Sequence, residues 1–310
     1  MTYDLIILGG GPGGVAAGVY AARKKIKTLL ITDVFGGQSL VSDDIQNWIG
    51  TPLISGFDLA KNLEAHVRSQ EGIDIREGDL AARVERANES GFRIQTQQGE
   101  IFDTRALLLT TGSRHRKLGV PGEKELEGKG VVYCATCDAP LFKGKRVAVV
   151  GGGNSGLEAV VDLFSYALKV YLLHRRDSLK GDAVTREKIE NNPDQATILY
   201  NVGVQEIRGD KWVTGLTYKD NKTGEVRTLD VEGIFVEIGS SPNSEIVADF
   251  VDRNKYGEIV VDPKTQRSSF SGIWAAGDVT DCFYKQNNIS VGDAVKAVLN
   301  INTFLHNSNA

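Results

Sequence analysis

The sequence is poor in cysteine and histidine, and it lacks a long apolar run. It has 3 cysteines and 4 histidines in 310 residues, and the histidines do not show metal-ligand spacing, so a four-ligand zinc site is not indicated. No apolar stretch approaches the ~20 residues that a membrane helix needs. The net charge of −4 gives no sign of a basic surface for nucleic acid or acidic lipids. We therefore expect no metal, no nucleic-acid partner and no membrane segment.

The N-terminus also lacks the basic segment of a secretory signal. Its apolar stretch runs directly into Gly9-Gly10-Gly11, which is typical of a first strand. With few cysteines and no export signal, the protein is expected in the reducing cytoplasm, where a close pair of cysteines is more often catalytic than structural. A chain of 310 residues has room for about two domains, each with its own core.

Two of the cysteines stand close together, in the segment Cys134-Ala135-Thr136-Cys137-Asp138. Two thiols at this spacing can close a small disulfide ring, and each can attack a mixed disulfide formed by the other. A short helix continuing through Phe142 would hold both sulfurs at its N-terminal end, where unpaired amides stabilise a thiolate and lower its pKa. Asp138 follows the second sulfur at once and is a candidate for proton transfer. Half of a zinc site is the alternative, but Cys282 lies far along the chain.

A nucleotide-binding signature opens the chain. An apolar strand from Tyr3 to Leu8 runs into Gly9-x-Gly11-x-x-Gly14, and a helix from Val15 to Lys24 and a strand from Lys27 to Thr32 follow. The glycines allow a tight turn, close approach of a pyrophosphate and close packing of helix on strand. Asp33 stands at the end of the second strand, where an acid accepts hydrogen bonds from a ribose. These features predict a site for a dinucleotide without a 2′-phosphate.

The same unit recurs after the cysteines. A strand from Arg146 to Val150 runs into Gly151-x-Gly153-x-x-Gly156, and a strand from Leu168 to His174 follows the next helix. Arg175 occupies the place that Asp33 holds in the first copy, and Arg176 stands beside it. Arginine suits a 2′-phosphate through bidentate, charge-assisted hydrogen bonds. The second copy is therefore predicted to bind NADP(H); the alternative is a solvated basic strand end.

A last signature near the C-terminus predicts how the two copies are arranged. The strand Gly272 to Ala276 ends in Gly277-Asp278, and a closing helix from Ser290 to Leu305 can point its N-terminus at an electron-rich ring. Breaks at Val120-Pro121-Gly122 and at Gly239 to Asn243 are candidate domain crossings. We therefore predict an α/β protein with two Rossmann-like dinucleotide-binding domains, the second inserted in the first. Residues 1–116 and 244–310 would form the first domain, and residues 117–243 the second, which carries the cysteines.

Short stretches along the whole chain match one known family in their order and spacing. They are Phe35-Gly36-Gly37-Gln38, Tyr133 to Asp138, Pro140 to Lys145, Gly151 to Ser155, His174-Arg175-Arg176, Ala275 to Asp278 and Tyr284-Lys285-Gln286. In these stretches the chain resembles the low-molecular-weight thioredoxin reductases, and even more closely the reductase portion of the flavoprotein component of bacterial alkyl hydroperoxide reductase. The resemblance implies FAD in the first domain, NADPH in the second, and a homodimer.

The resemblance also implies the residues that bind each cofactor. Those expected at FAD are Gly9, Gly11, Gly14, Asp33, Gly37, Gln38, Asn47, Gly277, Asp278, Lys285 and Gln286. Those expected at NADPH are Gly151, Gly153, Asn154, Ser155, Gly156, His174, Arg175, Arg176 and Lys180. Some positions depart from the family pattern. Lys180 replaces an arginine of the 2′-phosphate site, and Asn287-Asn288-Ile289 replace the usual small residues before the closing helix.

The implied reaction carries electrons from NADPH through FAD to the Cys134–Cys137 pair and on to a protein disulfide. By resemblance, Cys137 faces the flavin, Cys134 attacks a thioredoxin- or glutaredoxin-like partner, and Asp138 manages the proton. One site beside the flavin cannot hold nicotinamide and disulfide together, so the resemblance implies rotation about the two crossings. The hydroperoxide-reductase flavoprotein carries an extra N-terminal thioredoxin-like domain. Because the first strand here begins at Tyr3, we expect the partner to be a separate protein.

Three alternatives remain open. A ferredoxin-fed flavin thioredoxin reductase shares the flavin domain and the cysteine pair but needs no dinucleotide site, and a dithiol oxidase of similar fold uses oxygen. Arg175 and Arg176 count against both. A flavin-binding scaffold with a structural cysteine pair would accept electrons from no donor.

Overall fold

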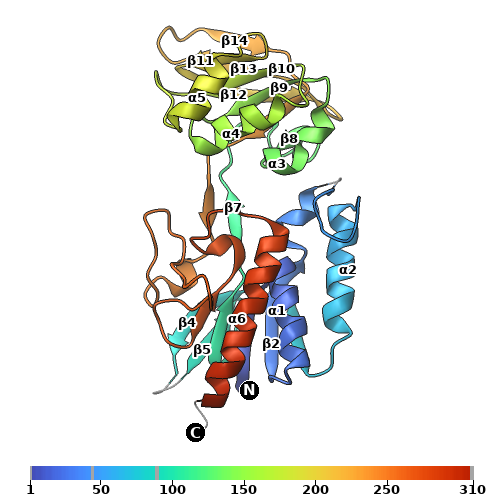
Figure 1. Ribbon diagram of the computed structural model, residues 1–310, viewed down its shortest axis with the longest axis vertical. Coiled ribbons are helices and arrows are strands. Elements are labelled where there is room, and N and C mark those ends of the chain that lie inside the picture. The colour runs from blue at the N-terminus through green and yellow to red at the C-terminus, as the bar shows by residue number, and fades with distance from the viewer. Residues whose placement is uncertain (1, 43–44, 88–90, 308–310) are drawn as a thin grey trace. The chain divides into compact units, whose positions relative to one another are not determined.

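The computed structural model describes residues 2–42, 45–87 and 91–307, and the chain forms two compact units (Figure 1). Unit 1 comprises Met1–Arg114 and Ser241–Ala310, and unit 2 comprises His115–Ser240. The sequence predicted the crossings at 116/117 and 243/244. The Val120-Pro121-Gly122 break lies within unit 2, because the Pro121 carbonyl accepts the Ile207 N–H at 2.9 Å.

Unit 1 is built on a sheet with the strand order β3-β2-β1-β6-β5-β4, in which β17 also pairs with β6. The parallel strands are β1 (Thr2–Gly10), β2 (Thr28–Phe35), β3 (Ile73–Glu77), β6 (Ile101–Leu109) and β17 (Ile273–Ala275). The antiparallel strands are β4 (Ala81–Arg86) and β5 (Phe92–Thr96). The central strand β1 is apolar on both sides, as a covered parallel strand requires.

Helices cover one face of this sheet. They are α1 (Pro12–Arg23), α2 (Gly56–Arg68) and α6 (Asn287–Asn307), and their apolar residues share one core with Leu5, Ile7 and Leu30 of the strands (Figure 1). The other face of the sheet packs on the 3₁₀ turn Glu245–Val247 and the irregular chain after it. Helix α1 begins earlier than predicted, because Pro12 has its φ angle preset for a first helical residue.

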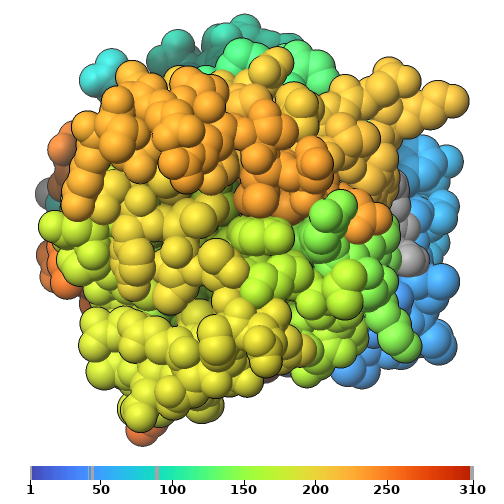
Figure 2. Space-filling model, turned by 90° about the horizontal axis from the view of Figure 1, so that it is seen from above, coloured from blue at the N-terminus to red at the C-terminus, as the bar shows by residue number. Residues whose placement is uncertain are grey.

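Unit 2 repeats this plan on a smaller scale. Its parallel sheet has the order β11-β10-β9-β15-β8, with β8 (Val131–Val132), β9 (Arg146–Val150), β10 (Lys169–His174), β11 (Ala196–Tyr200) and β15 (Gly233–Val236). The helices are α3 (Ala135–Asp138), α4 (Asn154–Leu163) and α5 (Ala183–Glu190). An antiparallel sheet of β12 (Val202–Gly209), β13 (Val213–Asp220) and β14 (Val226–Leu229) completes the unit. In Figure 2 the residues of this sheet lie in the yellow to orange part of the surface.

The two crossings between the units are paired with each other. Strand β7 (Ser113–His115) and strand β16 (Ser240–Pro242) form a two-stranded sheet. The Arg116 N–H donates to the Gly239 carbonyl at 2.9 Å, and the Asn243 N–H donates to the Gly112 carbonyl at 2.9 Å. The chain therefore leaves unit 1 and returns to it along one hydrogen-bonded ribbon.

Candidate active site

The cysteine pair is a disulfide in a short turn at the end of β8. Cys134 and Cys137 are bonded, with Cα atoms 5.3 Å apart. Cys134 is the extended residue before α3, and its carbonyl accepts the Asp138 N–H at 3.0 Å. The expected helix through Phe142 is wrong in part, because α3 ends at Asp138 and a 3₁₀ turn follows. Pro140 lacks the N–H that a continuing α-helix needs.

Asp138 is the last residue of α3, and its side chain is buried. The residue is 7% exposed. Burial in a low-dielectric environment disfavours the charged carboxylate and raises the pKa of Asp138 to about 7. At neutral pH the group is therefore balanced between its acid and base forms, as proton transfer to a sulfur requires.

The two glycine loops have the same internal geometry. In each loop the outer glycines are required by the packing of the chain, and the middle glycine is not. A Cβ on Gly9 would overlap the Thr110 carbonyl, and one on Gly14 would overlap the Gly9 carbonyl. A Cβ on Gly11, the middle glycine, would meet nothing within 4 Å. The tight turn and the close helix therefore account for the outer glycines, whereas the chain itself gives no steric reason for the middle one.

The second loop repeats this pattern. A Cβ on Gly151 would overlap the Glu237 carbonyl, and one on Gly156 would overlap the Gly151 carbonyl. A Cβ on Gly153 would meet nothing within 4 Å. Gly11 and Gly153 precede α1 and α4, and neither helix has a side-chain cap or an acidic residue in its first turn. Such helix N-termini with open space before them fit a pyrophosphate, whose charge the free N–H groups stabilise.

Residues far apart in sequence gather around the first loop. Gly37 lies against Gly11, because a Cβ added to Gly37 would be 3.4 Å from the Gly11 Cα. A Cβ on Gly277 would be 2.6 Å from the Ser290 Oγ, so this turn lies against the first residues of α6. Burial raises the pKa of Asp278 in the same turn. Asp33 is exposed, and β2 continues past it to Phe35 and does not end there as expected.

The polar residues expected at the flavin are held by hydrogen bonds within unit 1. Asn47 donates from Nδ2 to the Gln286 Oε1 at 3.2 Å, which joins the loop after β2 to the start of α6. Gln38 donates from Nε2 to the Ser113 carbonyl at 2.6 Å. Lys285 forms an ion pair of 3.1 Å with Glu258, so the Glu258 carboxylate balances the charge of its ammonium group. Sequence reasoning missed Glu258, since no local pattern links it to Lys285.

Asn287 and Asn288, which depart from the family pattern, add hydrogen bonds between the loop after β2 and α6. Asn287 donates from Nδ2 to the Ser39 Oγ at 3.0 Å, and Asn288 donates from Nδ2 to the Asn47 carbonyl at 2.8 Å. These amides therefore fasten the loop after β2 to α6, a role that small side chains cannot perform.

The second loop carries a group of exposed cations. Arg175 and Arg176 follow β10 directly, and across the described residues neither guanidinium forms an ion pair. Lys180 is also exposed, and its N–H donates to the Gly152 carbonyl at 2.8 Å, which places it beside the loop. Among the described residues, three exposed cations without ion-pair partners therefore lie near this loop, and their expected role at a 2′-phosphate stays a prediction.

His174 packs against the second glycine loop. His174 is 8% exposed as a residue, and a Cβ on Gly152 would be 2.5 Å from its Nδ1. Burial, and then the charges of Arg176, Arg175 and Lys180, lower the pKa of His174. The ring therefore packs against this loop, and its expected role in binding the nucleotide stays a prediction.

The remaining predicted residues of this group lie at the start of α4. Asn154 accepts the Asp182 N–H on its Oδ1 at 2.8 Å and so links the loop to the segment before α5. Ser155 is exposed at the same helix end.

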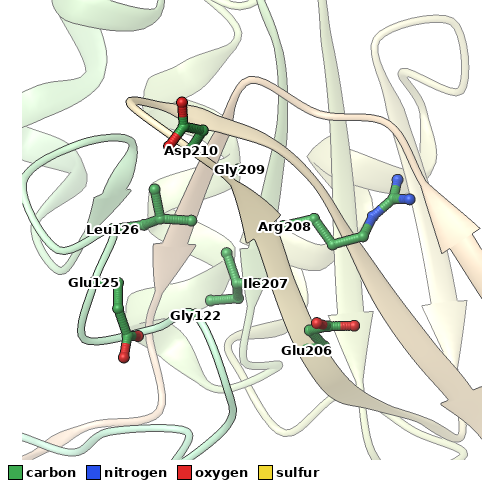
Figure 3. A pocket seen from close by; sticks show the side chains of 8 residues that line it. All are labelled: Gly122, Glu125, Leu126, Glu206, Ile207, Arg208, Gly209 and Asp210. Atoms are coloured by element: carbon green, nitrogen blue, oxygen red, sulfur yellow. The ribbon is translucent and has the colours of Figure 1, made fainter.

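Other kinds of site find no support in the part of the chain that is described. No helix there is long and apolar enough to cross a membrane. No group of histidine, cysteine and acidic side chains there could hold a metal ion. An open hollow of about 360 Å³ contains no predicted site residue (Figure 3). It is lined by Gly122, Glu125, Leu126, Glu206, Ile207, Arg208, Gly209 and Asp210.

The fold and the disulfide define an oxidoreductase with two nucleotide-binding units. The chain belongs to the pyridine nucleotide-disulphide oxidoreductase family, whose sequence profile matches residues 3–298. It is similar to a thioredoxin reductase from Streptococcus pyogenes MGAS5005, with a TM-score of 0.91 and 30% identity over 99% of both chains. The predicted fold class and the predicted family resemblance are confirmed, and the family binds FAD and a pyridine nucleotide.

Two sequence relatives are more similar still. The chain is 43% identical over 301 residues to an alkyl hydroperoxide reductase protein of Pseudomonas aeruginosa, a match that covers 96% of this chain and 57% of the relative. It is 41% identical over 297 residues to an NADH dehydrogenase of Bacillus subtilis, with the same coverage of 96% and 57%. The chain therefore spans little more than half the length of these relatives.

Proposed function

We propose that this protein is an NADPH-dependent flavoprotein that reduces the disulfide of a thioredoxin- or glutaredoxin-like protein through Cys134 and Cys137. The observation that carries the proposal is the disulfide beside Asp138, a buried acid with a pKa of about 7, in the unit that also holds a basic nucleotide loop. Unit 1 would hold FAD and unit 2 NADPH. The homodimer implied by the family resemblance is part of the same proposal.

The residues around each glycine loop fit these two cofactors. Gly11, Gly37 and the start of α1 would receive the FAD pyrophosphate, with Asp33 at a ribose and Asp278 at the cofactor's hydroxyls. Gly153 and the start of α4 would receive the NADPH pyrophosphate, with Arg175, Arg176 and Lys180 at the 2′-phosphate. When bound, NADPH supplies a hydride and FAD passes the electrons on as a pair.

The side chains of the turn around the disulfide would manage protons and sulfur exchange. Opening the Cys134–Cys137 bond takes two electrons and two protons to give two thiols. Asp138 is half-protonated near pH 7 and can deliver one of these protons. As a thiolate, Cys134 attacks the partner's disulfide and forms a mixed disulfide, and the partner's leaving sulfur takes up a proton. Cys137 then attacks Cys134, which restores the disulfide and releases the second partner thiol.

We expect the purified protein to release FAD on denaturation. Gly11→Ala should lower the fraction of protein that retains FAD and leave the thermal stability of the FAD-free protein unchanged, because the added Cβ would meet no atom within 4 Å. The contrasting variant is Gly14→Ala, whose methyl group overlaps the Gly9 carbonyl and should cost about 1–3 kcal/mol of folding free energy or more. Release of FMN, or of no flavin, would contradict the proposal.

A comparison of NADPH with NADH as electron donor tests the role of Arg175 and Arg176. Each arginine contact with a 2′-phosphate is worth about 1.5–3 kcal/mol. The double variant Arg175→Ala, Arg176→Ala removes two such contacts, so it should reduce kcat/KM with NADPH roughly 10²- to 10⁴-fold and change kcat/KM with NADH little. Arg227→Ala, an exposed arginine of β14 paired with Glu225, is the matched control.

NADH is a second candidate donor, since the Bacillus subtilis relative is an NADH dehydrogenase. Equal losses with both nucleotides, or no loss with either, would mean that the arginines do not read the 2′-phosphate, and a higher native kcat/KM with NADH than with NADPH would favour NADH. Flavin bleaching under anaerobic conditions by reduced ferredoxin and not by either nucleotide would favour a ferredoxin-fed enzyme. Bleaching by no donor would favour a scaffold.

A further inference from the structure

Three parallel strands of unit 2 end side by side at the disulfide. In the sheet register, Phe235 of β15 is opposite Val132 of β8, and Val236 of β15 is opposite Val150 of β9. Strand β8 leads to Cys134, and β9 leads to Gly151. Glu237, the first residue after β15, is therefore placed between the redox turn and the nucleotide loop, at the carboxyl edge where parallel sheets carry their sites.

The contacts of Glu237 reach both neighbours. Its N–H donates to the Val150 carbonyl at 2.8 Å, and its own carbonyl fills the space that a Cβ on Gly151 would need. Its carboxyl accepts a hydrogen bond from the backbone of Ala135, the residue that follows Cys134. The side chain thus fastens the first residue of α3 to the strand that supports the nucleotide loop.

The charged groups with the largest effect on this carboxyl are acidic. They are Asp138 on α3 and Glu158 and Asp162 on α4, and the Thr136 hydroxyl is hydrogen-bonded to Asp162. Burial, followed by repulsion from these acids, raises the pKa of Glu237 to about 8. With the pKa of Asp138 at about 7, both carboxyls are therefore more readily protonated at neutral pH than ordinary surface acids.

We propose, building on the proposed redox role of Cys134 and Cys137, that Glu237 is a positioning residue for this disulfide. Its hydrogen bond to Ala135 fixes the turn that carries Cys134, and its carboxyl shares with Asp138 the proton that the cysteines exchange. When the disulfide is reduced and one sulfur becomes a thiolate, the new negative charge favours protonation of Glu237. Above about pH 8, where Glu237 of the oxidised protein is ionised, its carboxylate can therefore take up the proton that the thiol loses.

The test is the equilibrium between disulfide and dithiol at different pH values. Native protein and Glu237→Gln, both with Cys282→Ser so that only the pair titrates, are equilibrated in a dithiothreitol redox buffer from pH 6 to pH 9.5. Alkylation and intact mass then give the fraction reduced. The glutamine side chain still accepts the Ala135 hydrogen bond but cannot ionise. Glu187→Gln, an exposed acid of α5, is the matched control.

We expect the two proteins to agree within about twofold at pH 6.5 and to diverge above pH 8. At pH 9 the pair in Glu237→Gln should be about tenfold more reduced at equilibrium, the equivalent of one pKa unit, because native Glu237 is then ionised and opposes a thiolate. A purely structural role predicts an equal shift at every pH, and either that result or no shift would overturn the proposal. The equilibrium needs neither nucleotide nor partner, so it reports on Glu237 even if NADPH turnover is absent.

The unfolding of the oxidised protein gives a second readout. The pKa of Glu237 is about 8 in the folded protein against an ordinary value of 4.5, so the folded state binds the proton more tightly. Its contribution to stability is therefore lost as the pH rises from 4.5 to 8. The melting temperature of Glu237→Gln should rise relative to the native value across that window. A constant difference would contradict a titrating Glu237.

Discussion

Serine at either Cys134 or Cys137 is expected to lower the reduction of a thioredoxin-like protein by roughly 10⁴-fold or more, to the background rate. The reason is chemical: one sulfur alone can form a mixed disulfide but cannot be restored to the oxidised pair. The assay follows partner thiols formed per minute with NADPH in excess. Cys282→Ser is the matched control and should keep native turnover, since Cys282 lies in unit 1, outside the redox turn.

The two serine variants should differ in what they trap. Family resemblance assigns Cys134 to the partner and Cys137 to the flavin side. Cys137→Ser should therefore accumulate a stable mixed disulfide between Cys134 and the partner, seen as a mass increase that dithiothreitol removes. Cys134→Ser should trap little. Trapping in Cys134→Ser alone would reverse the two roles, and full turnover in both variants would remove the pair from the active site.

Asp138→Asn is expected to lower turnover by about 10²- to 10⁴-fold, the range for a lost general acid or base. Asparagine keeps the size and polarity of the side chain but cannot carry a proton to a sulfur. The pH profile gives the sharper test. Native activity should change through a step near pH 7, where burial has placed the pKa of Asp138, and the asparagine variant should lack that step.

The control for this variant is Asp210→Asn, an exposed acid at the hairpin between β12 and β13. It should keep both the native rate and the native pH profile. An Asp138→Asn protein with reduced turnover but an unchanged step near pH 7 would show that another group moves the proton.

Features encoded within a short stretch of sequence could be predicted. Both glycine loops, the disulfide spacing and the cations after β10 lie next to the strands that position them, so reading along the chain is enough. The end of α3 is also encoded locally, because Pro140 lacks the N–H that a helix continuing to Phe142 needs.

Features that depend on which strands are neighbours could not be predicted. Glu237 reaches the redox turn only because β15 lies between β8 and β9, an order that no local pattern encodes. The pairing of Lys285 with Glu258 and the hydrogen bond from Asn288 to Asn47 likewise join distant segments. In each case the sequence identifies one partner, and only the packing of the fold supplies the other.

The open space before Gly11 and Gly153 has a consequence for how such a chain can diverge over evolutionary time. The outer glycines of both loops are held by the chain's own backbone, so a descendant that had lost its cofactors would still need them in order to fold. The middle glycines have no such internal restraint and would drift to larger residues once no ligand occupied the space. A descendant with intact outer glycines and a bulky residue at one middle position would therefore record, in its sequence alone, which of the two cofactors had been abandoned.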